Sequence, residues 1–266
     1  MSSHSEKWPQ QVGDPRRRRF LARMGAMAGG LFLAGCDQLS RTSWFPPILE
    51  SAEKLTHTMQ RLIAGRRAMA QEFTEAELSP QFRSNGTDEP DDEAYAALAE
   101  DDFANWRLEV RGLVEHPLSL SLADLRAMPS RTQITRHDCV EGWSAIGKWK
   151  GVQLSHLLEQ AAPRPNARYV VFRCADPMEG TEESKYYESI DMDDAWHAQT
   201  ILAYDLNGET LPVPNGAPLR LRVERQLGYK MAKYVMSIEL VESFAHIGGG
   251  KGGYWEDRGY EWYAGI

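Results

Sequence analysis

Cysteine, basic charge and long apolar runs are all scarce in this sequence. Three cysteines among 266 residues exclude a small scaffold held together by many disulfides. The 38 acidic residues outnumber the 30 basic ones, and the resulting formal charge of −8 predicts that duplex nucleic acid is not a partner. After position 36 no run of about 20 apolar residues occurs, so we do not expect the body of the chain to span a membrane. The 42% hydrophobic content is typical of a globular protein with one large or two small domains.

The first 35 residues have the pattern of an export signal. Four consecutive arginines at positions 16–19 precede a short apolar run, and the segment ends in Leu33-Ala34-Gly35-Cys36. Paired arginines before Phe-Leu resemble a twin-arginine signal, and Leu-Ala-Gly-Cys resembles the cleavage box of a bacterial lipoprotein. We expect residues 1–35 to be removed and Cys36 to carry a lipid, which places the protein in the periplasm or on the outer face of the inner membrane. The alternative is a basic tail followed by a buried helix.

The next segment predicts a tether, a helix and an acidic loop. Residues 36–78 form the lipidated tether and a helix, because apolar residues recur near helical spacing between Pro47 and Phe73. Residues 74–105 are acidic and contain the turn signals Ser79-Pro80 and Asn85-Gly86, so we expect a solvated loop there.

From position 106 onward, short strands dominate and short helices lie between them. Asn207-Gly208 between apolar runs predicts a hairpin, and Ser121 predicts the cap of a short helix that begins at position 122. The strand candidates are residues 106–110, 132–135, 169–173, 201–204, 219–223 and 237–241, and the other helix candidates are residues 154–161 and 192–198. Because helices and strands do not alternate regularly, the pattern predicts an α+β fold with mixed β-sheets rather than a doubly wound sheet.

The C-terminal tail combines glycines with aromatic residues. Positions 248–253 contain five glycines, and positions 254–263 contain five aromatic residues. Such rings need a surface to pack on, so the tail is either held against the core or forms the wall of a site. The sequence leaves both interpretations open.

Two cysteines remain if Cys36 carries a lipid. A disulfide between Cys139 and Cys174 is the default outside the cytoplasm, and two separate thiols or a metal ligand are the alternatives. Charged residues around Cys139, including Arg136 and His137, predict a lowered pKa and therefore a nucleophile or a ligand for a soft metal. A zinc site is disfavoured, because no second Cys/His pair follows at the spacing that zinc requires.

One stretch is basic although the protein is acidic. Residues 215–233 contain five basic residues and one acidic residue. Arg220 and Arg222 occupy alternate positions of a predicted strand, which puts both on one face. The run therefore indicates either phosphate binding or a solvated strand face.

Together these motifs resemble the sulfite oxidase-like, molybdopterin-dependent oxidoreductase family. The resemblance covers residues 79–266 and is carried by residues 136–143, 207–212, 215–221 and 228–234. Cys139-Val140-Glu141-Gly142-Trp143 is most similar to the branch of periplasmic protein-methionine-sulfoxide reductase catalytic subunits. The lipoprotein box and the aromatic tail depart from the well-known branches, which leaves the substrate open but not the cofactor.

The resemblance implies a role for individual residues. Cys139 would be the thiolate ligand of molybdenum, and Glu141, Tyr260 or Tyr263 would handle protons or tune the metal. The residues implied in binding the molybdenum-molybdopterin cofactor are Arg83, Ser84, Asn85, Cys139, Cys174, Asn215, Arg220, Lys230, Met231, Ala232 and Lys233. Cys174 falls where the reductases have a threonine, which is a departure from the family pattern. A thiolate bound to metal cannot also form a disulfide, so the resemblance disfavours the Cys139–Cys174 bond.

The implied activity is a two-electron oxygen-atom transfer, with sulfoxide reduction favoured. A sulfite-type dehydrogenase of the same fold and a lipoprotein that has lost the cofactor and serves as a binding module are the alternatives. No Cys-x-x-Cys-His haem motif occurs in the sequence, so electrons are expected from a separate partner, a membrane cytochrome.

Overall fold

The computed structural model describes residues 42, 44, 55–60, 62, 65, 67–181 and 184–266. The expected signal peptide, the lipid site Cys36 and most of the tether lie outside the described residues. The chain divides into two units at Thr56, and the second, His57–Ile266, contains every element discussed below. Among the described residues, no helix has both the length and the apolar character that crossing a membrane requires.

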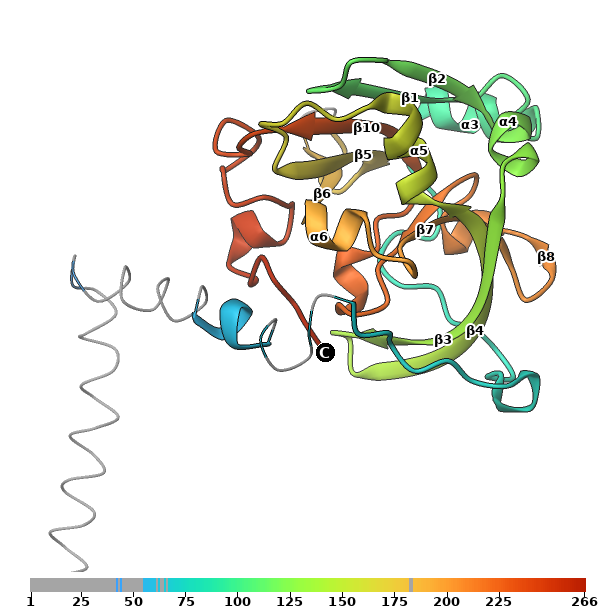
Figure 1. Ribbon diagram of the computed structural model, residues 1–266. Helices are drawn as coiled ribbons and strands as arrows, with labels where there is room; N and C mark the ends of the chain where they lie inside the picture. Colours follow the sequence, from blue (N-terminus) through green and yellow to red (C-terminus); the bar gives the residue numbers. More distant parts are fainter. Residues whose placement is uncertain are drawn as a thin grey trace, which may run out of the picture. The chain divides into compact units, whose positions relative to one another are not determined.

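Two five-stranded sheets form the body of this unit (Figure 1). The first has the order β2-β1-β10-β5-β6, and its β1–β10 pair is parallel while the other pairs are antiparallel. Its strands are β1 (Arg107–Gly112), β2 (Leu118–Ser121), β5 (Tyr169–Pro177), β6 (Lys185–Asp191) and β10 (Val235–Val241). This mixed sheet confirms the α+β class expected from the sequence.

The second sheet is built on a long hairpin. Its order is β3-β4-β7-β8, with β9 paired to β7, and Figure 1 shows β3 and β4 as a long curved pair. Its strands are β3 (Ser130–Cys139), β4 (Trp143–Gln153), β7 (Ile201–Leu206), β8 (Glu209–Thr210) and β9 (Arg220–Arg222). The predicted Asn207-Gly208 turn joins β7 to β8, and both residues have the positive φ that this hairpin turn requires.

The core lies on both faces of the second sheet. Along β7, Leu202 and Tyr204 join the larger apolar cluster with β1, β5, β10 and the α5 helix. Ile201 and Ala203 point to the opposite face and join a smaller cluster around the fully buried Trp149. Because side chains alternate along a strand, β7 contributes to both clusters at once. β9 pairs with β7 and places Arg220 and Arg222 on the face of Trp149, as their spacing predicted.

Short helices connect the strands. They are α3 (Glu93–Glu100), α4 (Leu122–Ala127), α5 (Leu154–Ala161), α6 (Met192–Ala195) and the 3-10 turns η1 (Glu75–Glu77), η3 (Val213–Asn215), η4 (Gly228–Lys230) and η5 (Glu256–Arg258). Ser121 caps α4 and exchanges hydrogen bonds with Asp124, as its position predicted. The α5 helix has the predicted bounds, whereas α6 ends at Ala195 instead of position 198.

Two predictions for the N-terminal half are wrong. The acidic stretch 74–105 is not only a solvated loop, since it contains α3 and buries Tyr95 and Phe82 in apolar clusters. The helix expected to reach Phe73 does not extend that far. Residues 55–60 and 62 are helical, Gly65 has a positive φ, and Glu72 forms a β-bridge to Thr135 of β3. Glycine in the left-handed conformation ends helices, which accounts for the shorter element.

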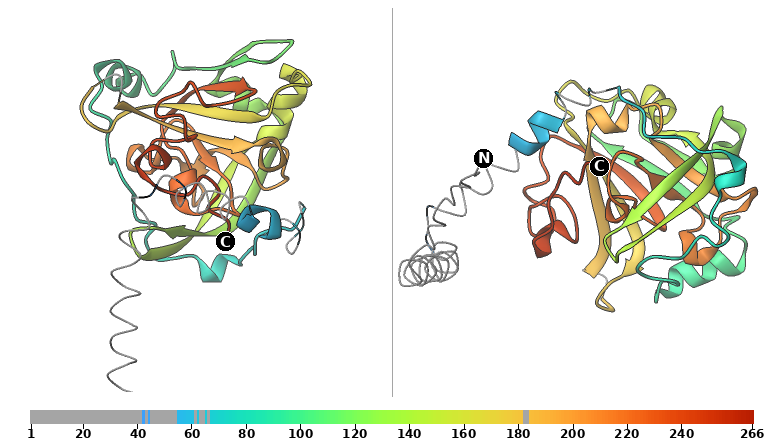
Figure 2. Two further views of the ribbon diagram at one scale, coloured as in Figure 1. Left: turned by 90° about the vertical axis from the view of Figure 1, so that its left-hand side faces the viewer. Right: turned by 90° about the horizontal axis from the view of Figure 1, so that it is seen from below.

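The C-terminal tail folds back against the first sheet (Figure 2). The backbone N–H of Tyr254 donates to Tyr187 of β6, and the Trp262 ring N–H donates to Ser189. Trp262 also packs on Phe244 and Tyr169. The aromatic tail is therefore part of the core packing, and it also contributes to the cavity described next.

Candidate active site

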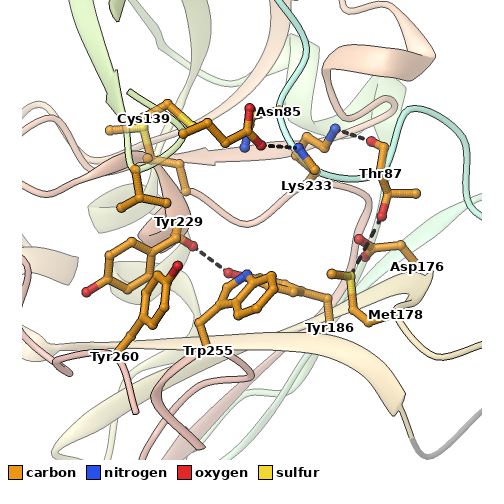
Figure 3. Close-up of a pocket in the computed structure, with 15 residues that line it drawn as sticks. Asn85, Thr87, Cys139, Asp176, Met178, Tyr186, Tyr229, Lys233, Trp255 and Tyr260 are labelled. Carbon is orange, nitrogen blue, oxygen red and sulfur yellow. Dashed lines mark hydrogen bonds between the residues drawn. The ribbon is translucent and has the colours of Figure 1, made fainter. Parts of the chain in front are cut away.

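A cavity of about 220 Å³ brings together residues from both sheets, the loop around Asn85 and the C-terminal tail (Figure 3). One part is aromatic and lies beside Cys139, and Figure 3 shows Asp176, Thr87 and Met178 on the opposite side of the view. The cavity is lined by Asn85, Gly86, Thr87, Cys139, Val140, Glu141, Asp176, Met178, Tyr186, Gly228, Tyr229, Met231, Lys233, Trp255 and Tyr260.

Cys139 is the last residue of β3, at the edge of the cavity. A tight turn follows it, in which Gly142 has a φ of +86° and its N–H donates to the Cys139 carbonyl at 3.1 Å. Only glycine adopts this conformation without strain, so the turn fixes where the sulfur points. Cys139 is half-buried, and both it and the buried Cys174 are free thiols, so the two are not joined by a disulfide.

The surroundings of Cys139 differ from the sequence expectation in one respect. Burial raises the pKa of the Cys139 thiol above its ordinary value, although Arg220 and Arg83 oppose this effect. The neighbouring basic residues therefore do not lower the pKa of the Cys139 thiol below its ordinary value, although the sequence had led us to expect that they would. Arg136 is exposed and binds Asp138, while His137 is fully buried, and burial holds the pKa of its imidazole well below the usual range. A cationic metal centre would stabilise the thiolate far more strongly than these side chains do.

Glu141 connects the cysteine turn to the loop across the cavity. Its Oε1 accepts from the Gly86 N–H at 3.2 Å, and its Oε2 accepts from the Trp143 ring N–H at 2.9 Å. Both carboxylate oxygens are engaged, so Glu141 is oriented toward the rim of the cavity beside Cys139.

Two buried cations next to the cavity are held mainly by neutral hydrogen-bond acceptors. Arg220 donates to the Asn85 side chain at 2.9 Å and to the Asn215 carbonyl at 3.0 Å, and Lys233 donates to the carbonyls of Thr87 and Pro214. Within the described residues neither cation forms an ion pair with a carboxylate. Burial, reinforced by Arg222, lowers the pKa of Arg220 to about 9, and burial next to Arg220 lowers that of Lys233 to about 7.

Unpartnered donors lie beside these cations. The Asn215 side-chain amide nitrogen and the Arg220 Nε are buried and have no hydrogen-bond partner in the part of the chain that the structure describes. A buried donor without a partner is costly, so such atoms mark a place where a ligand completes the hydrogen bonds. The combination of buried positive charge and free donors fits an anionic group.

The rest of the basic run has a structural role. Arg222 forms a fully buried ion pair with Glu224, and Lys230 lies between Glu188 and Glu256, with its Nζ 2.6 Å from Glu256. The Lys230 side chain does not line the cavity, which differs from the cofactor-binding role that the resemblance implied. Its charge is neutralised by the protein itself, so only part of the basic run is available to an anion.

The structure places the other implied residues at varying depth. Asn85, Met231, Lys233 and Tyr260 line the cavity. Ser84 and Asn215 lie behind it and contact Lys233 and Arg220, respectively. Four more implied residues do not line the cavity. The Arg83 guanidinium lies 5.4 Å from the centre of the Trp143 ring, and Tyr263 packs on His57. Cys174 and Ala232 are buried.

Several lining residues were missed by the sequence analysis. Tyr229, Trp255 and Asp176 line the cavity, and the sequence analysis gave none of them an individual role, although Tyr229 lies in the motif at residues 228–234 and Trp255 lies in the aromatic tail. Asp176 is 4% exposed and its Oδ1 has no partner, and burial raises the pKa of its carboxyl to about 7. The predicted strand ended at position 173, whereas β5 continues to Pro177 and carries Asp176, so the sequence analysis had no signal for this residue.

Comparison with known proteins identifies the family. The profile of the oxidoreductase molybdopterin binding domain matches residues 95–246. A protein of Azospira oryzae, provisionally named protein-methionine-sulfoxide reductase subunit YedZ1, is 38% identical over 94% of this chain and 88% of its own length. The protein-methionine-sulfoxide reductase catalytic subunit MsrP of Xanthomonas campestris pv. campestris is 36% identical over 85% of this chain and 70% of its own.

A solved structure also aligns with part of the chain. The sulfane dehydrogenase SoxCD from Paracoccus pantotrophus matches 53% of this chain and 39% of that chain, with 26% identity and a TM-score of 0.47. The family profile covers more than half of the sequence, and the first relative covers nearly all of it. The chain therefore belongs to the oxidoreductase molybdopterin-binding domain family and is a molybdopterin oxidoreductase.

Proposed function

We propose that this chain is the catalytic subunit of a sulfoxide reductase that acts on methionine sulfoxide. The observation that carries the proposal is one cavity that joins a half-buried thiol, buried cations that form no ion pair within the described residues, and an aromatic wall. The names of the two relatives support methionine sulfoxide as the substrate.

The residues of the cavity fit a molybdopterin cofactor. Arg220, Lys233 and the Asn215 amide would hold its phosphate. Arg220 and Lys233 supply buried positive charge, and the Arg220 Nε and the Asn215 amide nitrogen have no hydrogen-bond partner among the described residues. The Cys139 sulfur would be the protein ligand of molybdenum, a soft ligand held at a fixed turn. The bound cofactor supplies two-electron oxygen-atom transfer, and the protein supplies position and charge.

Protons are the contribution that the chain itself makes to the reaction. Reduction of a sulfoxide consumes two electrons and two protons, breaks the S–O bond and yields a thioether and water. Asp176 lines the cavity, and burial raises the pKa of its carboxyl to about 7, which suits it to bind and release a proton near neutral pH. The Tyr260 hydroxyl lies at the exposed rim of the same cavity. Both groups are suited to hold or pass a proton.

The test begins with the purified protein. We expect one molybdenum and one pterin per chain, reoxidation of a reduced dye by methionine sulfoxide, and loss of this activity in Cys139→Ser. A Cys174→Ala variant is the matched control, because it removes the other thiol from the core and leaves the cavity lining intact. Protein without molybdenum would support the binding-module alternative. Oxidation of sulfite without sulfoxide reduction would support the dehydrogenase alternative.

The proposal includes export, a lipid anchor and an electron partner. The arginines at positions 16–19 and the Leu-Ala-Gly-Cys sequence ending at Cys36 support twin-arginine export and lipidation of that cysteine. A chain without a haem-attachment motif needs another protein to deliver electrons, and a membrane cytochrome is within reach of a lipid-anchored enzyme. Cys36→Ser should move the activity from the membrane to the soluble fraction. An unchanged membrane fraction would contradict the anchor.

A further inference from the structure

We propose that Tyr229, Trp255 and Tyr260 form the substrate-binding surface that selects uncharged methyl sulfoxides over oxyanions such as sulfite. The inference rests on the proposed function and goes beyond it, because it assigns substrate specificity to three named side chains. It is drawn from three aromatic rings that share one wall of the cavity next to Cys139.

The three rings form a continuous surface. Trp255 and Tyr260 are stacked, with centroids 5.5 Å apart and an interplanar angle of 29°. Tyr229 meets Tyr260 edge to face, with centroids 5.1 Å apart at 86°. Figure 3 shows Tyr229 and Tyr260 side by side, with Trp255 next to them. Tyr260 is 41% exposed and Tyr229 is 8% exposed, so the surface runs from solvent into the cavity.

The surface is held in place from behind. The Tyr229 hydroxyl donates to the Glu261 carbonyl at 2.7 Å, and Lys230, the next residue, binds Glu256, which follows Trp255. Each ring therefore either makes a hydrogen bond itself, as Tyr229 does, or belongs to a residue whose neighbour in the sequence makes one, as Trp255 and Tyr260 do. A preorganised aromatic surface binds a ligand without the entropy loss of ordering a loop.

The chemistry of a methyl sulfoxide matches this surface. The sulfur and its methyl group carry partial positive charge and the oxygen carries the negative end of the dipole. Aromatic faces are electron-rich and attract the positive end, so the methylsulfinyl group would pack on the rings and turn its oxygen away from them. Sulfite has no apolar group and carries full negative charge, so the aromatic faces and the neighbouring Glu141 disfavour it, while the cation Lys233 in the same cavity is assigned to the cofactor phosphate.

The test separates binding from chemistry. For Trp255→Ala we expect the KM for N-acetyl-methionine amide sulfoxide to rise at least fivefold, with kcat within twofold and molybdenum content unchanged. Binding of the unreactive sulfone analogue, measured by titration calorimetry, should weaken by the same factor. Trp255→Phe should restore most of the affinity, because it keeps an aromatic face. Trp196→Ala is the matched control, since Trp196 is 42% exposed at the end of α6 and outside the cavity lining.

The outcomes distinguish this inference from the proposed function. If the wild type reduces the sulfoxide and Trp255→Ala leaves KM and sulfone affinity unchanged, the inference is overturned and the proposed function stands. A loss of kcat together with molybdenum would show that Trp255 supports the cofactor site, which also overturns it. If the wild type binds no sulfone and reduces no sulfoxide, both fail.

Discussion

Arg220 donates from its Nη2 to the side-chain oxygen of Asn85 at 2.9 Å, although 135 positions separate the two residues in the sequence. The contact joins β9 to the loop before α3, and Asn85 of that loop lines the cavity. Arg220 also lies 5.3 Å from the Trp149 ring, fully buried. A buried guanidinium that has only neutral partners is an unusual arrangement in a protein without a ligand, because burial of charge is costly unless it is compensated.

The first prediction concerns Arg220→Met. The substitution removes a buried, uncompensated charge and keeps the volume of the side chain. We expect the cofactor-free protein to be no less stable than wild type in urea unfolding, while the molybdenum and pterin content falls at least tenfold. Replacing buried charges by apolar side chains is often neutral or stabilising by about 1 to 4 kcal/mol.

A second arginine gives the matched control for this experiment. Arg126 on α4 pairs with Asp205 away from the cavity, and Arg126→Met should leave the cofactor content unchanged. If Arg220→Met unfolds the cofactor-free protein or retains the full complement of pterin, Arg220 is a structural residue and does not hold the phosphate.

Local signals in the sequence predicted local structure well. Asn207-Gly208 specified its hairpin because both residues tolerate a positive φ, and the alternation of Arg220 and Arg222 specified a shared strand face. Ser121 specified the start of α4 in the same way. Each of these features depends on residues that are close together in the chain.

Features that depend on distant contacts were not predictable in this way. The 11-residue strand β4 was missed, although it pairs with β3 and β7, and α3 was hidden in a stretch whose composition resembles a solvated loop. The cavity wall was predicted only in part: the aromatic tail was one candidate for a wall, but the sequence did not show which rings line the cavity. Tyr229 and Trp255 acquire their role when η4 and η5 meet beside β6, and the sequence carries no periodic signal of that meeting.

The second prediction concerns the buried cluster of Lys230, Glu188 and Glu256. Lys230→Met leaves two buried carboxylates without their cation, and removal of one partner of a buried ion pair costs about 3 to 5 kcal/mol. We expect the free energy of unfolding, measured in urea, to fall by that amount. Adding Glu256→Gln to Lys230→Met should recover part of it, because the remaining negative charge is smaller. If Lys230→Met is as stable as wild type, the cluster does not hold the tail to the core.

The third prediction concerns the close approach of η4 to β3. A Cβ at Gly228 would lie 2.4 Å from the His137 ring, so Gly228→Ala must displace either the imidazole or the cavity floor. We expect a loss of about 1 to 3 kcal/mol, as for other overpacked sites, together with a lower molybdenum content. In Gly208→Ala the new Cβ meets open space and only the positive φ is strained. That control should lower stability without affecting the metal, and an equal loss of molybdenum in both variants would contradict the argument.

The fourth prediction concerns pH and Asp176. Burial raises the pKa of Asp176 from 3.8 to about 7 in the folded protein. Between pH 4 and 7 the unfolded chain therefore binds fewer protons than the folded one, so stability falls as the pH rises through this range and is level above it. The largest penalty is about 4 kcal/mol, from roughly 3 pKa units at 1.36 kcal/mol each. Asp176→Asn removes the ionisable group, and the variant should be increasingly more stable than wild type from pH 4 to 7.

The free energy of unfolding is measured in urea on cofactor-free protein as a function of pH. Two neighbouring residues, Lys233 and Asp88, bear on the interpretation. Lys233 faces Asp176, and because burial lowers the Lys233 pKa to about 7, its own contribution makes stability rise with pH above 7, in a separate window. Asp88→Asn is the matched control, since Asp88 is an exposed carboxylate next to Thr87, and it should follow the wild-type profile. A constant difference between Asp176→Asn and wild type from pH 4 to 8 would show that Asp176 is charged in the folded protein throughout this range, and its role as a proton holder in the cavity would be excluded.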